Sequence, residues 1–146
     1  MLKTTFKQYL RLAQVIGDEV TSKSLGIDRE DMPQVKDYDD FEQFLENNGV
    51  KYSYVNNKDP MEYRTAQRHV SNKKIVAMLD KDITKPILVS SDNYIIDGTH
   101  RFAVAVMKHQ MINVLRVDMK AKELLKFIKN DYYNVSFKKL HEEKTL

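Results

Sequence analysis

The sequence contains no cysteine and no tryptophan, and it has only three prolines and four glycines in 146 residues. The absence of cysteine excludes disulfide bonds, thiolate metal ligands and a cysteine nucleophile. No run approaches the roughly eighteen apolar residues that a membrane-spanning helix needs. Lys3, Lys7 and Arg11 place charges along the first residues, where a secretory signal would need an apolar run. We therefore expect a cytoplasmic protein with no membrane association.

The residues that are present are typical of one folded domain. Hydrophobic residues make up 42% of the chain and charged residues 31%, and a chain of this length forms a single domain over residues 1–146. Residues 1–50 carry six Lys/Arg against ten Asp/Glu, a net −4, whereas residues 51–146 carry eighteen against eleven, a net +7. A basic half suits a phosphate-bearing ligand or a nucleic acid, although solvated surfaces also show this pattern.

Apolar spacing predicts a mixed order of helices and strands. Residues at three- and four-residue spacing predict helices over 4–16, 40–48, 70–79, 99–109 and 121–130. Alternating or continuous apolar runs predict strands over 50–55, 86–90, 94–97 and 112–119. We expect an α+β (mixed α/β) domain with a small mixed sheet flanked by helices. Residues 136–146, rich in lysine, are expected to form a loosely held tail.

Local signals refine two of these helices. Asp39 or Asp40 is expected to cap the helix over 40–48, and Gly49 is expected to end it. In the helix over 70–79 the apolar side chains are predicted to pack inward: Val70, Ile75, Val76 and Leu79. Pro33 favours an extended conformation from Met32 to Val35.

The junction between a strand and a helix over residues 92–105, DNYIIDGTHRFAVA, is the strongest functional signal. A strand that reverses at Gly98 into a helix leaves the first backbone N–H groups of that helix unpaired, and these attract anions. Thr99 can cap the helix or offer its hydroxyl to a ligand. Arg101 supplies a planar charged group suited to phosphate oxygens, and His100 can donate a hydrogen bond or transfer a proton.

Asp97 is the unexpected member of this set, because a carboxylate beside a phosphate site repels the ligand unless a cation or a hydroxyl proton intervenes. Two roles fit it: a ligand for Mg²⁺ on nucleotide phosphates, or a base for an attacking hydroxyl. The alternative is structural: Asp97 caps the turn, His100 lies on the helix surface, and Arg101 pairs with a nearby acid.

A second group of hydrogen-bond donors precedes the helix over 70–79. Arg64, Gln67, Arg68 and His69 lie within six residues, and they can contribute to a ligand site or form an exposed helix start.

Residues 85–118, KPILVSSDNYIIDGTHRFAVAVMKHQMINVLRVD, resemble the core of the ParB/sulfiredoxin superfamily. The resemblance depends on the Pro-Ile-x-Val strand and on Asp-Gly-x-His-Arg at the end of the second strand. It implies a core over about 63–130, with an N-terminal helical extension over 1–50. It also implies that the turn and the helix start hold nucleotide phosphates through Gly98, Thr99, His100 and Arg101, with Gln67 and Arg68 beside them.

The motif separates this chain from two branches of that superfamily. Sulfiredoxins carry a cysteine in the motif, where this chain has Thr99, so their reaction is excluded. Chromosome-partition ParB proteins have Gly-Glu-Arg-Arg and a helix-turn-helix domain, which this sequence lacks.

The motif is most similar to Asp-Gly-His-His-Arg of the ParB-like free serine kinase. That similarity implies phosphoryl transfer from ATP or ADP to the hydroxyl of a small substrate, with Asp97 and His100 as catalytic residues, Asp97 on Mg²⁺, and His100 and Arg101 on phosphates. The kinase also uses a glutamate before the Pro-Ile strand, where this chain offers Gln67, with Glu62 five residues earlier.

We therefore expect a nucleotide-binding phosphotransferase. The alternative is a ParB-like DNA-associated protein, either a nuclease or a nucleotide-regulated DNA-binding factor, and a third hypothesis is a non-catalytic interaction module.

Overall fold

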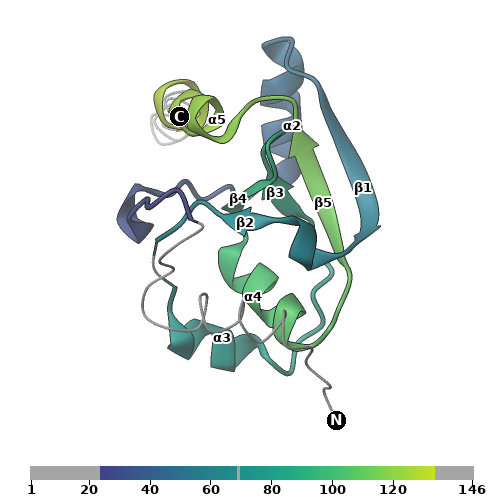
Figure 1. The fold of residues 1–146 in the computed structure, drawn as a ribbon. Helices are drawn as coiled ribbons and strands as arrows, with labels where there is room; N and C mark the ends of the chain where they lie inside the picture. The colour runs from purple at the N-terminus through teal and green to yellow at the C-terminus, as the bar shows by residue number, and fades with distance from the viewer. Residues whose placement is uncertain (1–23, 69, 134–146) are drawn as a thin grey trace, which may run out of the picture.

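The computed structural model describes residues 24–68 and 70–133 (Figure 1). The helix expected over 4–16, His69 and the expected tail over 136–146 lie outside the described residues. In the described part, no helix has the length and apolar character needed to cross a membrane.

The described residues form one α+β domain around a five-stranded mixed sheet. Its strands, in spatial order, are β1 (Tyr52–Lys58), β5 (Ile112–Val117), β3 (Ile87–Val89), β4 (Tyr94–Asp97) and β2 (Arg64–Thr65). β1 and β5 are antiparallel, β5 and β3 parallel, β3 and β4 antiparallel, and β4 and β2 parallel. The strands predicted over 86–90 and 94–97 are present as β3 and β4, which pair as a hairpin, whereas the two-residue β2 was missed because its sequence is polar.

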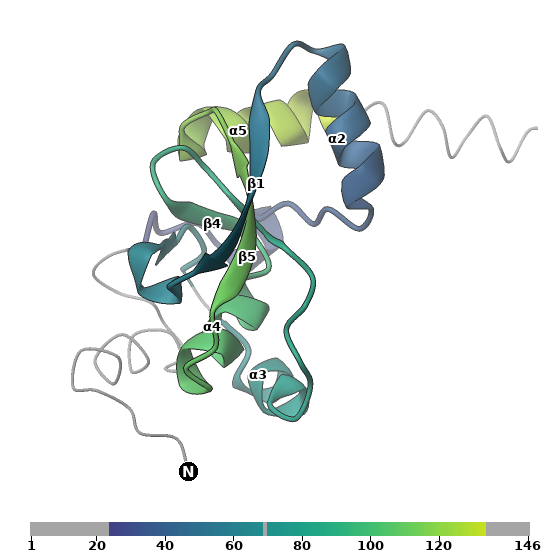
Figure 2. The same cartoon turned by 90° about the vertical axis from the view of Figure 1, so that its right-hand side faces the viewer.

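Within the described residues, four α-helices cover the two faces of this sheet. They are α2 (Tyr38–Asn47), α3 (Asn72–Met78), α4 (Thr99–Met107) and α5 (Ala121–Phe127), the last continuing as a π-helix over Ile128–Tyr132. Short 3₁₀ turns over Arg29–Asp31 and Pro60–Glu62 complete the fold. Figures 1 and 2 show α2 and α5 together at one end of the molecule and α3 and α4 at the other.

Successive side chains along the strands point to opposite faces of the sheet, so each face has its own apolar core. Ile87, Val89 and Ile95 pack with α3 and α4, whereas Leu88 and Ile96 pack with α2 and α5. This period of two is why short strands with continuous apolar sequences are buried on both faces.

Residues before position 63 belong to the same core. Phe41 and Leu45 of α2 are fully buried, and the rings of Phe44 and Phe127 stack with their centroids 5.0 Å apart. The packed core of the described residues therefore includes α2, which precedes the segment over about 63–130 that the resemblance covers.

Two local predictions were wrong. The cap of α2 is Asp37, whose side chain accepts hydrogen bonds from the backbone N–H groups of Asp39 and Asp40, because Asp37 is the last residue with an extended backbone. Val76 is 66% exposed and does not pack inward, since one residue along a helix turns the side chain about 100° away from buried Ile75.

Candidate functional site

A cavity of about 340 Å³ lies at the junction between β4 and α4. We call it the junction cavity. It is lined by Met32, Pro33, Gln34, Val35, Lys36, Gln67, Lys74, Met78, Lys85, Ile96, Asp97, Gly98, Thr99, His100 and Arg101. The sequence-predicted site residues from 97 to 101 thus share one cavity, to which the segment before α2 and the helix α3 also contribute.

Positive charge exceeds negative charge among the described residues that line this cavity. Lys36, Lys74, Lys85 and Arg101 are cationic, and Asp97 is the one carboxylate. Among the residues that the structure describes, neither Lys36 nor Lys74 forms a side-chain hydrogen bond or an ion pair. The cavity therefore favours an anionic ligand.

Asp97 lies at the end of β4 and has well-defined partners. Its Oδ2 accepts a hydrogen bond from the Tyr38 hydroxyl at 2.8 Å and one from Arg101 Nη2 at 3.5 Å. Burial raises the pKa of the Asp97 carboxyl above its usual value of 3.8, while Tyr38, Arg101, Lys85 and the backbone of Val35 oppose that rise. A buried carboxylate with a raised pKa is a better proton acceptor than an exposed one.

Arg101 folds back against the junction instead of extending into solvent. Its Nη1 donates to the carbonyl oxygens of Lys85 at 3.1 Å and Pro86 at 2.8 Å. Its Nη2 donates to the Tyr38 hydroxyl at 3.3 Å and to Asp97. These four acceptors match the four Nη hydrogens of the guanidinium. The alternative that Arg101 pairs with a nearby acid is confirmed, and this acid is Asp97.

Tyr38 connects these groups and was missed at the sequence level. Its hydroxyl donates to Asp97 and accepts from Arg101, and the ammonium of Lys85 lies 4.8 Å from the centre of its ring. Burial, followed by the Asp97 charge, raises the pKa of the Tyr38 hydroxyl, which keeps it protonated as a donor. The one sequence signal for such a partner was Asp97 itself, an unexpected acid beside a predicted phosphate site.

His100 joins the starts of α3 and α4. Its Nε2 accepts a hydrogen bond from the backbone N–H of Ser71 at 3.0 Å, and Ser71 caps α3 through its own side chain. Nε2 therefore carries no proton in this arrangement, and any proton on the ring is on Nδ1. The contact also holds α3, and with it Lys74, beside the junction cavity.

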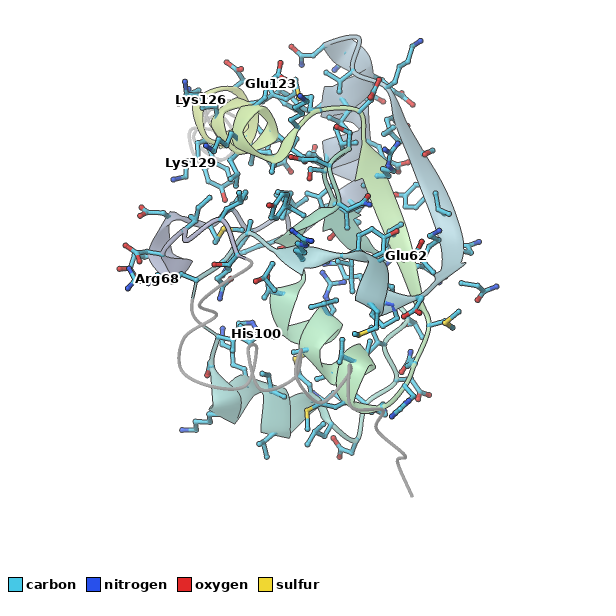
Figure 3. All side chains as sticks on the ribbon, viewed as in Figure 1. Glu62, Arg68, His100, Glu123, Lys126 and Lys129 are labelled. Carbon is cyan, nitrogen blue, oxygen red and sulfur yellow. The ribbon has the colours of Figure 1, made fainter. Side chains whose placement is uncertain are left out.

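The remaining predicted residues separate into two groups. Thr99 and Gln67 are buried, with 4% and 5% exposure, and both line the cavity. Arg68 is exposed and does not line it. Glu62 is paired with Lys58 at 3.2 Å, and Figure 3 shows it on the opposite side of the molecule from Arg68. Glu62 therefore does not replace the glutamate that the resemblance implied.

Gly98 is needed at the turn for two reasons. It precedes α4 with φ 93°, in the left-handed region, and a Cβ there would lie 2.7 Å from Arg101 Nη2. Gly98→Ala should lower the free energy of unfolding by at least about 2 kcal/mol, because it adds backbone strain and displaces Arg101. Denaturant unfolding measures this change.

Gly49→Ala is the matched control for Gly98→Ala. Gly49 also has a positive φ of 68°, but a Cβ there would meet nothing within 4 Å, so only about 1 kcal/mol of strain is expected. Equal losses in the two variants would contradict a specific contact between Gly98 and Arg101.

The described residues contain no cluster of three or more His, Asp or Glu side chains that could hold a metal ion. Asp97 is the single carboxylate among the described residues that line the cavity. Mg²⁺ commonly binds through one or two carboxylates together with substrate phosphates, so the site fits Mg²⁺ only in company with a phosphate ligand.

Comparisons with known proteins identify no relative of this chain. No family model, no curated protein and no solved structure matches it. What the chain binds is therefore inferred from the geometry of the junction cavity.

Proposed function

We propose that the chain binds a nucleotide in the junction cavity and transfers a phosphoryl group from ATP or ADP to the hydroxyl of a small substrate. The observation that carries this proposal is the excess of cationic side chains around one carboxylate at the start of α4. Catalysis of phosphoryl transfer consists mainly of positioning and of electrostatic stabilisation, which such a site can supply.

The cavity offers distinct surroundings for the parts of such a ligand. Backbone N–H groups at the start of the nine-residue α4 suit phosphate oxygens, and a volume of about 340 Å³ falls at the small end of known ligand pockets. Apolar side chains of Met32, Pro33 and Met78 form other parts of the lining. These can pack against the less polar part of a nucleotide.

Asp97 is the group that accepts the proton of the attacking hydroxyl. Its Oδ2 already accepts a hydrogen bond from one hydroxyl, that of Tyr38. Asp97 would also hold Mg²⁺ together with a phosphate ligand, and the ion would neutralise phosphate charge there.

The strand, glycine turn and helix formed by β3, β4 and α4 support a ParB/sulfiredoxin-like assignment of this domain, because the Asp-Gly-x-His-Arg motif stands where β4 passes into α4.

Binding is tested first by thermal unfolding with ATP, ADP and CTP, each with Mg²⁺. A ligand at a hundred times its dissociation constant adds about 2.7 kcal/mol of stability, which raises Tm by about 5–10 °C for a chain of this size. A screen of hydroxyl-bearing acceptors by mass spectrometry then detects phosphoryl transfer. The absence of any shift at millimolar nucleotide would contradict the proposal.

A groove separate from the junction cavity favours the alternative of a DNA-associated protein. It has a volume of about 330 Å³ and includes Lys122, Lys126 and Lys129, of which Figure 3 shows Lys126 and Lys129 on the same side of the molecule as Arg68. The nearby Asp31 lies 4.0 Å from Lys129, which reduces the net charge.

DNA binding through this groove predicts a steep salt dependence, measured by fluorescence anisotropy with a labelled duplex. Replacing the three lysines with glutamine should reduce the slope of log K against log salt concentration by about 2.7, since each phosphate contact contributes about 0.9. If the unaltered chain shows no binding at low salt, the DNA-associated alternative is wrong.

A further inference from the structure

We propose that Lys36 and Lys74 form a two-sided clamp for a polyphosphate, so that the junction cavity selects ligands with at least two linked phosphates over those with one. This inference rests on the proposed nucleotide function and identifies the residues that supply the charge and the class of ligand that they select.

Arg101 uses its hydrogen-bond donors inside the protein. All four of its Nη hydrogens have acceptors inside the protein, at Lys85, Pro86, Tyr38 and Asp97. A ligand that recruited these hydrogens would leave buried acceptors without partners, which is unfavourable. Arg101 is therefore a positioning residue that supports the cavity wall.

The three lysines that line the cavity differ in their contacts. Lys85 lies over the ring of Tyr38, and its charge acts on Asp97, so it belongs to the same internal network. Lys36 and Lys74 line the cavity, are exposed, and form no side-chain hydrogen bond or ion pair within the described residues. These two charges are available to a ligand without breaking a contact.

The two available lysines come from different parts of the fold. Lys36 precedes the cap of α2, whereas Lys74 belongs to α3. In Figure 1 these helices lie on either side of the start of α4. Charges that approach from two elements suit a chain of linked phosphates better than a single phosphate, which one lysine together with the helix start can satisfy.

The test measures binding of ADP, AMP and tripolyphosphate by calorimetry to the full chain and to three variants. Lys36→Gln and Lys74→Gln should each weaken ADP and tripolyphosphate binding about fivefold, the effect of losing one partly exposed ion pair, and should weaken AMP binding less. Lys73→Gln is the matched control, because Lys73 is the neighbouring exposed residue on α3 and does not line the cavity.

The outcomes separate the inference from the proposed function. If nucleotides bind but Lys36→Gln and Lys74→Gln behave like Lys73→Gln, or if AMP binding falls as much as ADP binding, the clamp is wrong and the nucleotide proposal stands. If tripolyphosphate binds with the expected lysine dependence and no nucleotide binds, the clamp stands and the nucleotide proposal fails. If no probe binds, both are overturned.

Discussion

Asp97→Asn should lower phosphoryl transfer by about 10²–10⁴-fold, the usual contribution of a general base, while nucleotide binding measured without Mg²⁺ stays equal or becomes tighter. Binding should not weaken because the replacement removes the one negative side chain among the described residues that line the junction cavity. Asparagine retains an oxygen that accepts from Tyr38 and Arg101, so the local geometry should persist. Turnover assays and nucleotide titrations measure the two effects separately.

The same variant has a predictable effect on stability. The pKa of Asp97 is raised in the folded protein, mainly by burial, so the folded chain holds a proton in a pH range where the unfolded chain has lost it. The stability that Asp97 provides is therefore largest at acidic pH and falls as pH rises through the folded pKa. At neutral pH, Asp97→Asn should be at least as stable as the unaltered protein, and this advantage should disappear below the unfolded pKa of about 4.

Asp40→Asn is a matched control for Asp97→Asn. Asp40 also accepts a hydrogen bond from a buried tyrosine, Tyr132, at 3.0 Å, but it does not line the junction cavity. It should leave turnover unchanged. Near-normal turnover in Asp97→Asn would exclude Asp97 as the base, and nucleotide binding without any turnover in the unaltered protein would favour the non-catalytic module.

The parts of this structure that were predicted from sequence are those that short-range patterns determine. The strand predicted over 112–119 is found as β5, and α4 was predicted to begin after Gly98, because a glycine after an apolar run signals a turn. The residues from Asp97 to Arg101 are consecutive, so their shared cavity followed from the turn itself.

The missed parts depend on contacts between distant residues. Tyr38 lies 59 positions before Asp97 in the sequence, and no local pattern distinguishes it from the other apolar residues of α2. Lys36 and Lys74 resemble any exposed lysines until the fold places them at one cavity. Arg101 was assigned to phosphate because its chemistry suits an anion, yet the carbonyl groups of Lys85 and Pro86 compete for the same hydrogens.

This competition gives Arg101→Ala the largest expected effect on stability. The side chains of Arg101 and Asp97 are only 15% and 14% exposed, so removing the guanidinium leaves a mostly buried carboxylate without its cation. Removal of one partner of such a pair costs about 3–5 kcal/mol. Denaturant unfolding should therefore show a marked loss of stability for Arg101→Ala in the absence of any ligand.

A double variant shows whether this loss comes from the network. When Asp97→Asn is added to Arg101→Ala, both members of the buried charge pair are gone, so the double variant should recover about 1–3 kcal/mol relative to Arg101→Ala alone. Arg101→Lys should recover little, because an ammonium lacks the planar set of donors that reaches four acceptors. If Arg101 instead served only to bind phosphate, Arg101→Ala would change stability by less than about 0.5 kcal/mol and would abolish nucleotide binding alone. That result would mean that Arg101 binds the phosphate. It would also remove the reason for proposing that Lys36 and Lys74 bind it instead.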